Sequence, residues 1–472
     1  MIPLTLAEIA DVVSGEVVDA EPETAVTGPA FLDSRSPEPG GLFVAFVGEH
    51  VDGHDYAAGA VSGGAAAVLG SRRSGAPGVL VADARQALQA LARHVLAELR
   101  RGGGGPQVVA VTGSQGKTTA KDLLARVLAD AAPTVATAGS FNNELGLPLT
   151  VLRATAETRY LVLEMGARGV GHLAELCAIA PPDISLVLNV GKAHIGEFGS
   201  QEQIAVAKGE LVEALSAEGA AVLNRDDPLV AAMAERTSAA VWTFGRNPEA
   251  TVRLDRLELD DLGRPAFDLV HAGATEHVRM QLLGEHQATN AAASAAVALA
   301  AGLELAPVAA SLGAIERLSP WRMEVVERAD GLVVVNDAYN ANPDSMRAAL
   351  QTLARMGARG DRSTVAVLGE MRELGGSAAE EHRAVGVLAH ELGIGKVLVV
   401  GDGARGVYDA LVELRGEDGT TRHVDTVDEA GAWLRENVSG PDAVLVKASR
   451  SGRLERVAEE LVAQRPGEES GR

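Results

Sequence analysis

Short apolar runs alternate with longer stretches of helical spacing over most of the chain. The runs are three to five residues long, and most are bounded by glycine or polar residues. They lie at 108–111, 160–163, 184–188, 332–335, 365–368, 397–400 and 444–446. Runs of this kind are typical of strands buried on both faces, and the stretches between them predict helices. Such alternation predicts parallel sheets flanked by helices, so the expected fold class is α/β.

Two breaks interrupt this pattern. Gly102 to Gly105, followed by Pro106, is a flexible stretch compatible with neither helix nor strand. Ser319-Pro320 ends a long helical region and precedes a strand-rich segment. A length of 472 residues at roughly 150 residues per domain suggests about three domains. We place them at residues 1–104, 105–318 and 319–472, the first being the smaller and the more mixed in helix and strand.

Composition narrows the class of protein. The formal net charge is -22, which disfavours nucleic acid as a partner because its binding depends on phosphate neutralisation by Lys and Arg. The single cysteine, Cys177, excludes an internal disulfide. Thr5 and Glu8 have the spacing of a capping box, which predicts a helix at the N-terminus. A targeting signal would begin with a basic segment followed by an apolar one, and the sequence has neither there. We expect a cytoplasmic protein without a membrane anchor.

The strongest motif is a glycine-containing turn between the first buried strand of the second domain and a helix from about Lys117. It reads T-G-S-Q-G-K-T-T over residues 112–119. In a phosphate-binding loop the backbone N–H groups and the helix N-terminus hold the phosphates, Lys117 contacts them, and Thr118 ligates Mg²⁺. The expected nucleotide contacts are Gly113, Ser114, Gln115, Gly116, Lys117, Thr118 and Thr119. One departure is Val111, where the general pattern has glycine; the alternative is a glycine-rich turn beside a chance Lys-Thr pair.

This spelling resembles the phosphate loop of the Mur ligases and of their folate-ligase relatives. Further segments resemble that family in the same order along the chain. They are F-N-N-E-L-G-L-P from Phe141, Glu164 at a strand end, the stretch from Asn189 through His194 to Ser200, A-K-G-E from Ala207, G-E-H-Q-A-T-N from Gly284, and P-W-R-M-E from Pro320. Gln287 stands where the family usually has asparagine. The resemblance covers nearly the whole chain.

The resemblance implies a central phosphate-loop ATPase domain, a C-terminal Rossmann-like domain and a smaller N-terminal domain that binds a UDP-sugar. It implies ATP and two Mg²⁺ ions as cofactors. The catalytic residues would be Lys117, Glu164, His194, Lys208 and Arg322, and the metal would be held by Thr118, Glu164, His194 and Lys208. Asn290 would lie near the base, with Asp337 and Asn340 on the nucleotide side. Several members carry a carbamylated lysine, which would here be Lys208.

Two segments indicate which reaction within the family to expect. N-D-A-Y-N-A-N-P-D-S-M from Asn336 and L-G-E-M-R-E-L-G from Leu368 resemble members that add D-alanyl-D-alanine to UDP-N-acetylmuramoyl-tripeptide through an acyl phosphate, in peptidoglycan synthesis. The expected substrate contacts are Ser34, Arg35, Asn142, Asn143, Lys447, Ser449 and Arg450. The sequence does not distinguish diaminopimelate from lysine in the acceptor peptide. We expect a monomer.

Three alternatives remain. The first is another amide ligase of the same superfamily, either the tripeptide-forming member or folylpolyglutamate synthase; the segment from Asn336 disfavours both. The second is a non-catalytic nucleotide-binding scaffold, which would be expected to lose Lys117, Glu164, His194 or Lys208. The third is a dinucleotide-binding protein, because G-D-G-A-R-G at 401–406 follows a predicted strand, with Asp425 at a suitable distance. A lone match of that kind is weak in a glycine-rich chain.

Overall fold

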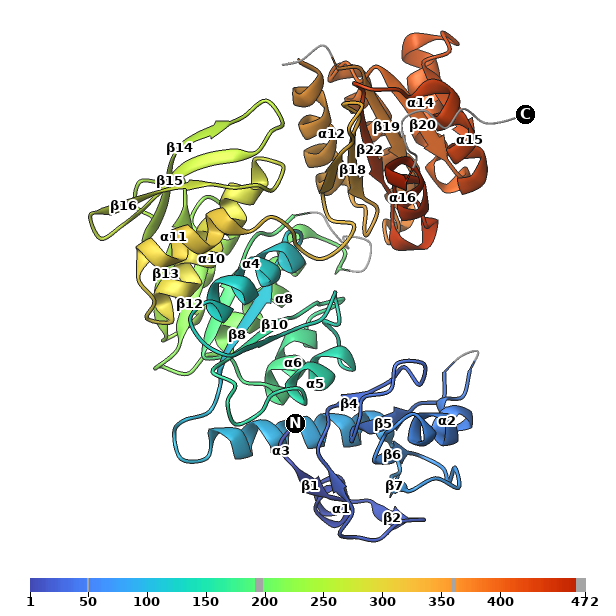
Figure 1. Ribbon diagram of the computed structural model, residues 1–472. Coiled ribbons are helices and arrows are strands. Elements are labelled where there is room, and N and C mark those ends of the chain that lie inside the picture. Colours follow the sequence, from blue (N-terminus) through green and yellow to red (C-terminus); the bar gives the residue numbers. More distant parts are fainter. Residues whose placement is uncertain (49–50, 192–197, 359–361, 464–472) are drawn as a thin grey trace.

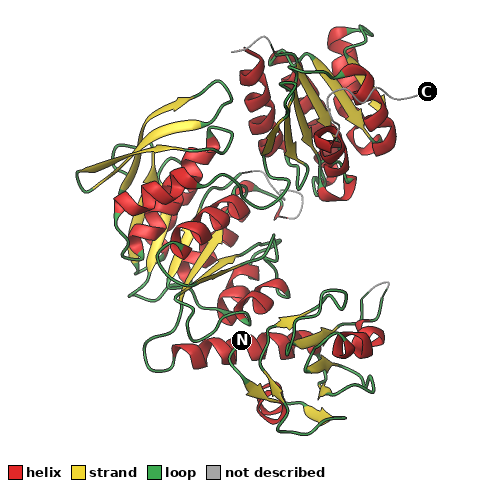
Figure 2. Cartoon of the chain, in the orientation of Figure 1, coloured by secondary structure: helices red, strands yellow, loops and turns green. Residues whose placement is uncertain are grey.

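The computed structural model describes residues 1–48, 51–191, 198–358 and 362–463. Figure 1 shows three lobes, with the central lobe lying between the N-terminal and the C-terminal lobes. Each lobe contains its own main β-sheet with helices packed beside it (Figure 2). The α/β class expected from the strand–helix alternation is therefore confirmed.

The N-terminal lobe mixes short strands with one long helix. Its strands are β1 (Leu4–Thr5), β2 (Glu16–Val18), β3 (Ala25–Val26), β4 (Ala30–Phe31), β5 (Leu42–Ala45), β6 (Ala67–Gly70) and β7 (Gly78–Leu80), and its helices are α1 (Leu6–Val13), α2 (Ala57–Ser62) and α3 (Ala84–Arg100). The main sheet has the order β2-β7-β6-β5-β4. The expected capping box of Thr5 and Glu8 begins α1.

The central lobe is built on a nine-stranded sheet. Its strands are β8 (Gln107–Thr112), β9 (Thr134–Ala136), β10 (Tyr160–Glu164), β11 (Ile184–Val187), β12 (Ala220–Asn224), β13 (Ala240–Gly245), β14 (Val252–Leu259), β15 (Pro265–His271) and β16 (Ala274–Arg279). Its helices are α4 (Lys117–Ala129), α5 (Gly146–Val151), α6 (His172–Ile179), α8 (Gln201–Glu213), α9 (Pro228–Ala231), α10 (His286–Ala300) and α11 (Leu305–Ala314). The order is β16-β15-β14-β13-β12-β11-β8-β10-β9.

Successive residues of β8 face opposite sides of this sheet, and both sides are buried. Val108 and Ala110 belong to a core that continues into the N-terminal lobe through α3. Val109 and Val111 belong to a second core beneath α4, α10 and α11. A strand whose two faces are both covered must be apolar throughout, which explains its uninterrupted run of small and branched side chains. The carboxyl end of β8 therefore emerges between two packed layers, at the start of the phosphate loop.

The C-terminal lobe carries a six-stranded sheet of order β17-β18-β22-β19-β20-β21. These strands are β17 (Glu324–Glu327), β18 (Val333–Asp337), β19 (Thr364–Leu368), β20 (Lys396–Val400), β21 (Thr421–Val424) and β22 (Ala443–Lys447). The helices are α12 (Pro343–Ala358), α13 (Ala378–Glu391), α14 (Arg405–Arg415), α15 (Val427–Asn437) and α16 (Glu455–Ala463). Separate cores lie on the two faces of the sheet.

The central and C-terminal sheets are mostly parallel, as expected, but each has antiparallel strands at one edge, which the sequence pattern did not predict. In the central sheet β14, β15 and β16 are antiparallel to one another, and in the C-terminal sheet β17 pairs antiparallel with β18. Antiparallel strands can follow each other through short turns and need no crossover helix, so strand–helix alternation does not reveal them. The alternating apolar and polar residues of β14 were the available signal.

The connection between the central and C-terminal lobes is held under local backbone strain. Trp321 and Met323 adopt left-handed φ angles of 61° and 50°, which non-glycine residues rarely do. The backbone N–H of Ser319 donates to Asp122 of α4 at 2.9 Å, and that of Met323 donates to Asp337 at 3.1 Å. The strained turn therefore lies between contacts to both lobes and orients Arg322.

In the described part of the chain, no helix combines the length and the apolar character needed to cross a membrane.

Candidate active site

The phosphate loop connects β8 directly to α4. Gly116 caps α4 with a left-handed φ of 79°, and a side chain there would also clash with Asn290, since an added Cβ would lie 2.8 Å from its amide oxygen. Lys117 begins the helix, and its Nζ folds back to donate to the carbonyl of Gly113 at 2.8 Å. Burial lowers the pKa of Lys117; Glu164 opposes this shift and Arg322 adds to it. The backbone of the loop thus holds its lysine inside the site.

Glu164, at the carboxyl end of β10, is 1% exposed. The hydroxyl of Thr118 donates to one carboxylate oxygen and the amide of Asn142 to the other, both at 2.7 Å. The backbone N–H of Glu164 donates to Thr137 at 3.1 Å, which fixes the strand end. A buried carboxylate beside a hydroxyl is a pair of hard oxygen donors, the kind of ligand that Mg²⁺ prefers. The donor set therefore fits a magnesium ion.

Lys208 lies on α8 and is 5% exposed. Burial lowers its pKa well below the usual value, and the charge of Lys117 adds to this effect. The helix around it is fixed by Arg236, whose guanidinium donates to the carbonyls of Ala205 and Val206 at 3.1 and 2.9 Å. Arg236 packs against Gly209, where an added Cβ would clash with it. Lys208 is accordingly held at a defined position as a buried amine with reduced affinity for a proton.

The C-terminal lobe contributes a second set of charged side chains. The guanidinium of Arg322 lies 4.0 Å from the ring centre of Tyr339, and its buried Nε has no hydrogen-bond partner among the residues that the structure describes. The Tyr339 hydroxyl is hydrogen-bonded to Ser140 of the central lobe. Lys447 pairs with Asp337 at 2.5 Å and donates to the carbonyl of Asn340 at 2.8 Å. Arg322 is therefore directed by an aromatic ring, and its orphaned N–H is available for an anion.

These groups line one cleft of about 850 Å³ between the central and C-terminal lobes. Of the expected site residues, it gathers Ser114, Gln115, Gly116, Lys117, Thr118, Thr119, Asn142, Asn143, Glu164, Lys208, Asn290, Arg322, Asp337, Asn340 and Lys447. Arg85 of α3 also lines it and lies 3.6 Å from Glu144, so the N-terminal lobe reaches its rim. Gly113 contributes its carbonyl to Lys117 and does not line the cleft.

The remaining expected residues lie elsewhere. Ser449 and Arg450 line a second cavity of about 230 Å³ in the C-terminal lobe, which shares Asn340 and Asn342 with the main cleft. Ser34 and Arg35 follow β4 in the N-terminal lobe, where the exposed Arg35 pairs with Asp33 at 2.8 Å. His194 lies outside the described residues.

Asn290 and its neighbours form the floor of the cleft on α10. The amide of Asn290 donates to Gln287 at 3.3 Å and lies against Gly116. Burial lowers the pKa of His286, which also lines the cleft. The glutamine at position 287 is thus accommodated as a buried partner of Asn290.

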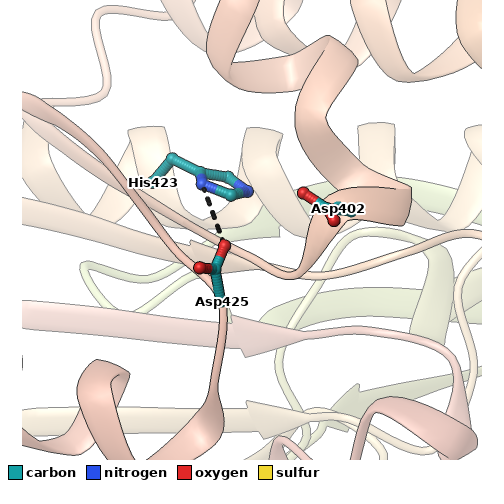
Figure 3. A group of neighbouring side chains, drawn as sticks. All are labelled: Asp402, His423 and Asp425. Atoms are coloured by element: carbon teal, nitrogen blue, oxygen red, sulfur yellow. Dashed lines mark ion pairs between the residues drawn. The ribbon is translucent and has the colours of Figure 1, made fainter.

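The glycine motif at 401–406 lies away from the cleft. Gly401 follows β20, and the motif continues through a 3-10 helix (Asp402–Ala404) into α14. Asp402, His423 and Asp425 come together at the carboxyl ends of β20 and β21 (Figure 3), with potential ligand atoms within 4.8 Å of one another. His423 lies 3.8 Å from Asp425 and contacts the carbonyl of Gly401 at 3.3 Å. None of the three lines the cleft, so the motif does not belong to the site around Lys117.

Sequence reasoning assigned no role to two residues that shape the site. Asn189 contacts the phosphate loop through its side chain, and Tyr339 supports Arg322. An asparagine directly after a buried strand was a usable signal for the first, because polar side chains at that edge face the ligand crevice of an α/β sheet. The contact of Tyr339 crosses between two lobes, and no local pattern reports it.

The fold and the cleft define a phosphate-loop enzyme in which a second α/β lobe, the C-terminal one, lies across the cleft from the phosphate loop. Three family models match the chain: "Mur ligase family, catalytic domain" at residues 31–96, "Mur ligase middle domain" at 111–298, and "Mur ligase, glutamate ligase domain" at 321–450. The chain belongs to the Mur ligase family, whose members are ATP-dependent amide ligases.

Full-length relatives agree. A Mycobacterium tuberculosis protein named UDP-N-acetylmuramoyl-tripeptide–D-alanyl-D-alanine ligase is 46% identical, with 98% of each chain covered. The Escherichia coli protein of that name is 34% identical, with 98% of this chain and 99% of that one covered. Among solved structures, MurF from Acinetobacter baumannii superposes with a TM-score of 0.85 at 30% identity, covering 98% of this chain and 100% of that one. MurF from Thermotoga maritima, in complex with ADP, gives 0.77 at 30%, covering 93% and 98%.

Proposed function

We propose that this protein joins D-alanyl-D-alanine to UDP-N-acetylmuramoyl-tripeptide, with release of ADP and phosphate, in peptidoglycan precursor synthesis. The observation that carries the proposal is the convergence of Lys117, the Thr118–Glu164 pair, Lys208 and Arg322 on one cleft. The names of the full-length relatives support the choice of substrates. We further propose that the protein acts in the cytoplasm as a monomer.

The reaction needs activation because joining a carboxylate to an amine is unfavourable in water. ATP phosphorylates the terminal carboxylate of the acceptor to give an acyl phosphate, the amine of the dipeptide attacks the carbonyl carbon, and phosphate leaves. Phosphoryl transfer depends mainly on positioning and on charge neutralisation. Lys117 and Arg322 approach the cleft from its two sides and would supply positive charge to the transferred phosphoryl group.

Thr118 and Glu164 would hold one Mg²⁺, and His194, Glu164 and Lys208 a second. A magnesium ion bound there supplies charge neutralisation for the phosphate oxygens. Lys208 would serve as a ligand after carbamylation, because an ammonium would repel the ion whereas its carbamate provides hard oxygen donors. The lowered pKa of Lys208 supports this, since only the neutral amine adds carbon dioxide.

We assign the substrates to the three predicted domains. Residues 1–104 would bind the UDP-sugar, with Ser34 and Arg35 near the nucleotide. Residues 105–318 would bind ATP, with Asn142 and Asn143 toward the acceptor. Residues 319–472 would complete the ATP site through Asp337 and Asn340 and would bind the dipeptide. The second cavity supports that last assignment: it adjoins the main cleft and carries Ser449 and Arg450, and Lys447 lies near their junction.

The assignment is tested by phosphate release with UDP-N-acetylmuramoyl-tripeptide, ATP and Mg²⁺, comparing D-alanyl-D-alanine, D-alanine, L-lysine and diaminopimelate as the amine. We expect D-alanyl-D-alanine to give a kcat/KM at least about a hundredfold above the others, because contacts to both residues of the dipeptide contribute to discrimination. Acceptors with lysine or diaminopimelate as the third residue are compared in parallel. Turnover with a single amino acid and not with the dipeptide would favour another ligase of the superfamily.

The positions of Arg322 and Asp337 lead to a prediction about domain movement. Both belong to the C-terminal lobe, beyond Ser319-Pro320, yet both must act on a nucleotide bound at Lys117. We expect the C-terminal lobe to rotate toward the central lobe on binding, which would exclude water from the acyl phosphate. Solution scattering with an ATP analogue plus acceptor should give a smaller radius of gyration than the free protein. Identical dimensions would contradict the prediction.

A further inference from the structure

The side chain of Asn189 is hydrogen-bonded to the phosphate loop at three points. Its Oδ1 accepts from the backbone N–H groups of Ser114 and Gln115, both at 3.0 Å. Its Nδ2 donates to the carbonyl of Gln115 at 3.1 Å. The backbone carbonyl of Asn189 also accepts from the Ser114 N–H at 3.1 Å. Asn189, two residues beyond the end of β11, thus binds the backbone N–H groups of Ser114 and Gln115 and the carbonyl of Gln115 at the tip of the loop.

Asn189 is itself held in place on both sides. The amide of Asn224, at the end of β12, donates to the carbonyl of Leu188 at 2.8 Å. The N–H of Val190 donates to Asp227 at 2.8 Å. The loop in turn contacts the same segment, since the N–H of Gly191 donates to the hydroxyl of Ser114 at 2.8 Å. The position of the loop is therefore fixed by the ends of two neighbouring strands, β11 and β12.

This arrangement determines which N–H groups can bind phosphate. Those of Ser114 and Gln115 are already satisfied, so the phosphates must be bound from Gly116 onward, at the N-terminus of α4. A helix N-terminus carries unpaired N–H groups and partial positive charge, which suits a phosphate. A loop restrained by these contacts also loses less conformational entropy on binding a nucleotide than an unrestrained loop would.

We propose that Asn189 is a positioning residue that preforms the phosphate loop and thereby sets the affinity for the nucleotide. This role goes beyond the ligase assignment and rests only on nucleotide binding at the loop, whichever amine is the second substrate. It differs from a purely structural role in one measurable respect: removing the contacts weakens nucleotide binding in a protein that remains folded.

The test uses the full chain and Mg²⁺-ADP as the probe, with binding measured by calorimetry. Asn189→Ala removes all three side-chain contacts, and we expect the Kd to rise at least about tenfold, the effect of losing one or two net hydrogen bonds. Asn189→Asp keeps both accepting contacts, loses the donor to Gln115 and adds negative charge near the phosphates. Its second carboxylate oxygen faces the carbonyl oxygen of Gln115, so we expect a lower Tm in a protein that is still folded at the assay temperature, and a Kd that rises at least about threefold.

Asn437→Asp is the matched control, because Asn437 also donates its amide to a backbone carbonyl, that of Trp433, in the C-terminal lobe. Its Kd should stay within a factor of two of the wild type. In steady-state assays the KM for ATP should rise in both Asn189 variants while the KM for the UDP-linked acceptor stays unchanged. A Kd that rises less than about tenfold in folded Asn189→Ala, or less than about threefold in folded Asn189→Asp, would overturn the proposal. Since ADP binding requires neither acceptor nor amine, this outcome is independent of the ligase assignment.

Discussion

Lys117→Ala should reduce kcat at saturating ATP by at least about a hundredfold, the cost of removing one preorganised charged donor from a transition state. The stability of the folded protein should not decrease. Burial lowers the pKa of Lys117, so at neutral pH its ammonium is less favourable in the folded chain than in the unfolded one. We therefore expect the nucleotide-free Tm of Lys117→Ala to equal or exceed that of the wild type.

Lys396→Ala is the control for Lys117→Ala. Lys396 begins β20, far along the C-terminal sheet from the cleft, and donates to the carbonyl of Asn437 at 2.7 Å. Phosphate release by this variant should match the wild type. More than a tenth of wild-type turnover in Lys117→Ala at saturating ATP would rule out the role given to Lys117.

Lys208→Ala should lose activity to a similar extent, because the proposed second metal loses an oxygen ligand. A short carboxylate such as acetate should restore part of the activity by filling the space left by the side chain. The same acetate concentrations should not restore Lys117→Ala, whose missing group is a cation. Near-normal turnover by Lys208→Ala, or a high-resolution structure at neutral pH with bicarbonate that shows a bare amine turned away from the metal, would exclude a carbamate at this position.

The pH dependence of the wild type gives a second test of Lys208. Carbamylation consumes the neutral amine and carbon dioxide and releases a proton, so protonation of the amine competes with it. The lowered pKa of Lys208 increases the fraction of neutral amine at a given pH, and this fraction falls as the pH falls through the folded-state pKa. Activity should therefore decline toward acid pH, and added bicarbonate should move the decline to lower pH. A bicarbonate-independent profile would contradict the carbamate.

The sequence predicted the buried strands well because their cause is local. Each predicted run, such as 108–111 or 444–446, matches a strand whose faces are both covered, with only Leu188 and Leu332 falling one residue outside β11 and β18. Phosphate-loop residues could be named for the same reason, since strand, turn and helix are consecutive. The three domain boundaries stay a prediction, as do the individual roles within the site.

What the sequence did not reveal depends on contacts between distant segments. Asp337 and Lys447 were assigned to different ligands, yet they form an ion pair across β18 and β22. When a ligand enters the cleft, either this ion pair breaks or Asp337 and Lys447 contact the ligand as a pair. The contact between Asn189 and the loop joins residues 74 and 75 positions apart. No spacing rule relates such positions, because the sheet order β11-β8 brings them together.

The core shared by the N-terminal and central lobes affects how the protein should unfold. Leu88, Leu91 and Val95 of α3 belong to the same buried cluster as Leu147, Leu161 and Leu173 of the central lobe. The C-terminal sheet has cores largely of its own. The main sheets of the N-terminal and central lobes should therefore unfold as one cooperative unit and the C-terminal sheet as a second. Scanning calorimetry should resolve two transitions. A fragment that ends near residue 104 would expose one side of α3 to water, so the first hundred residues are a poor choice for expression alone, whereas a fragment beginning near residue 319 should fold by itself.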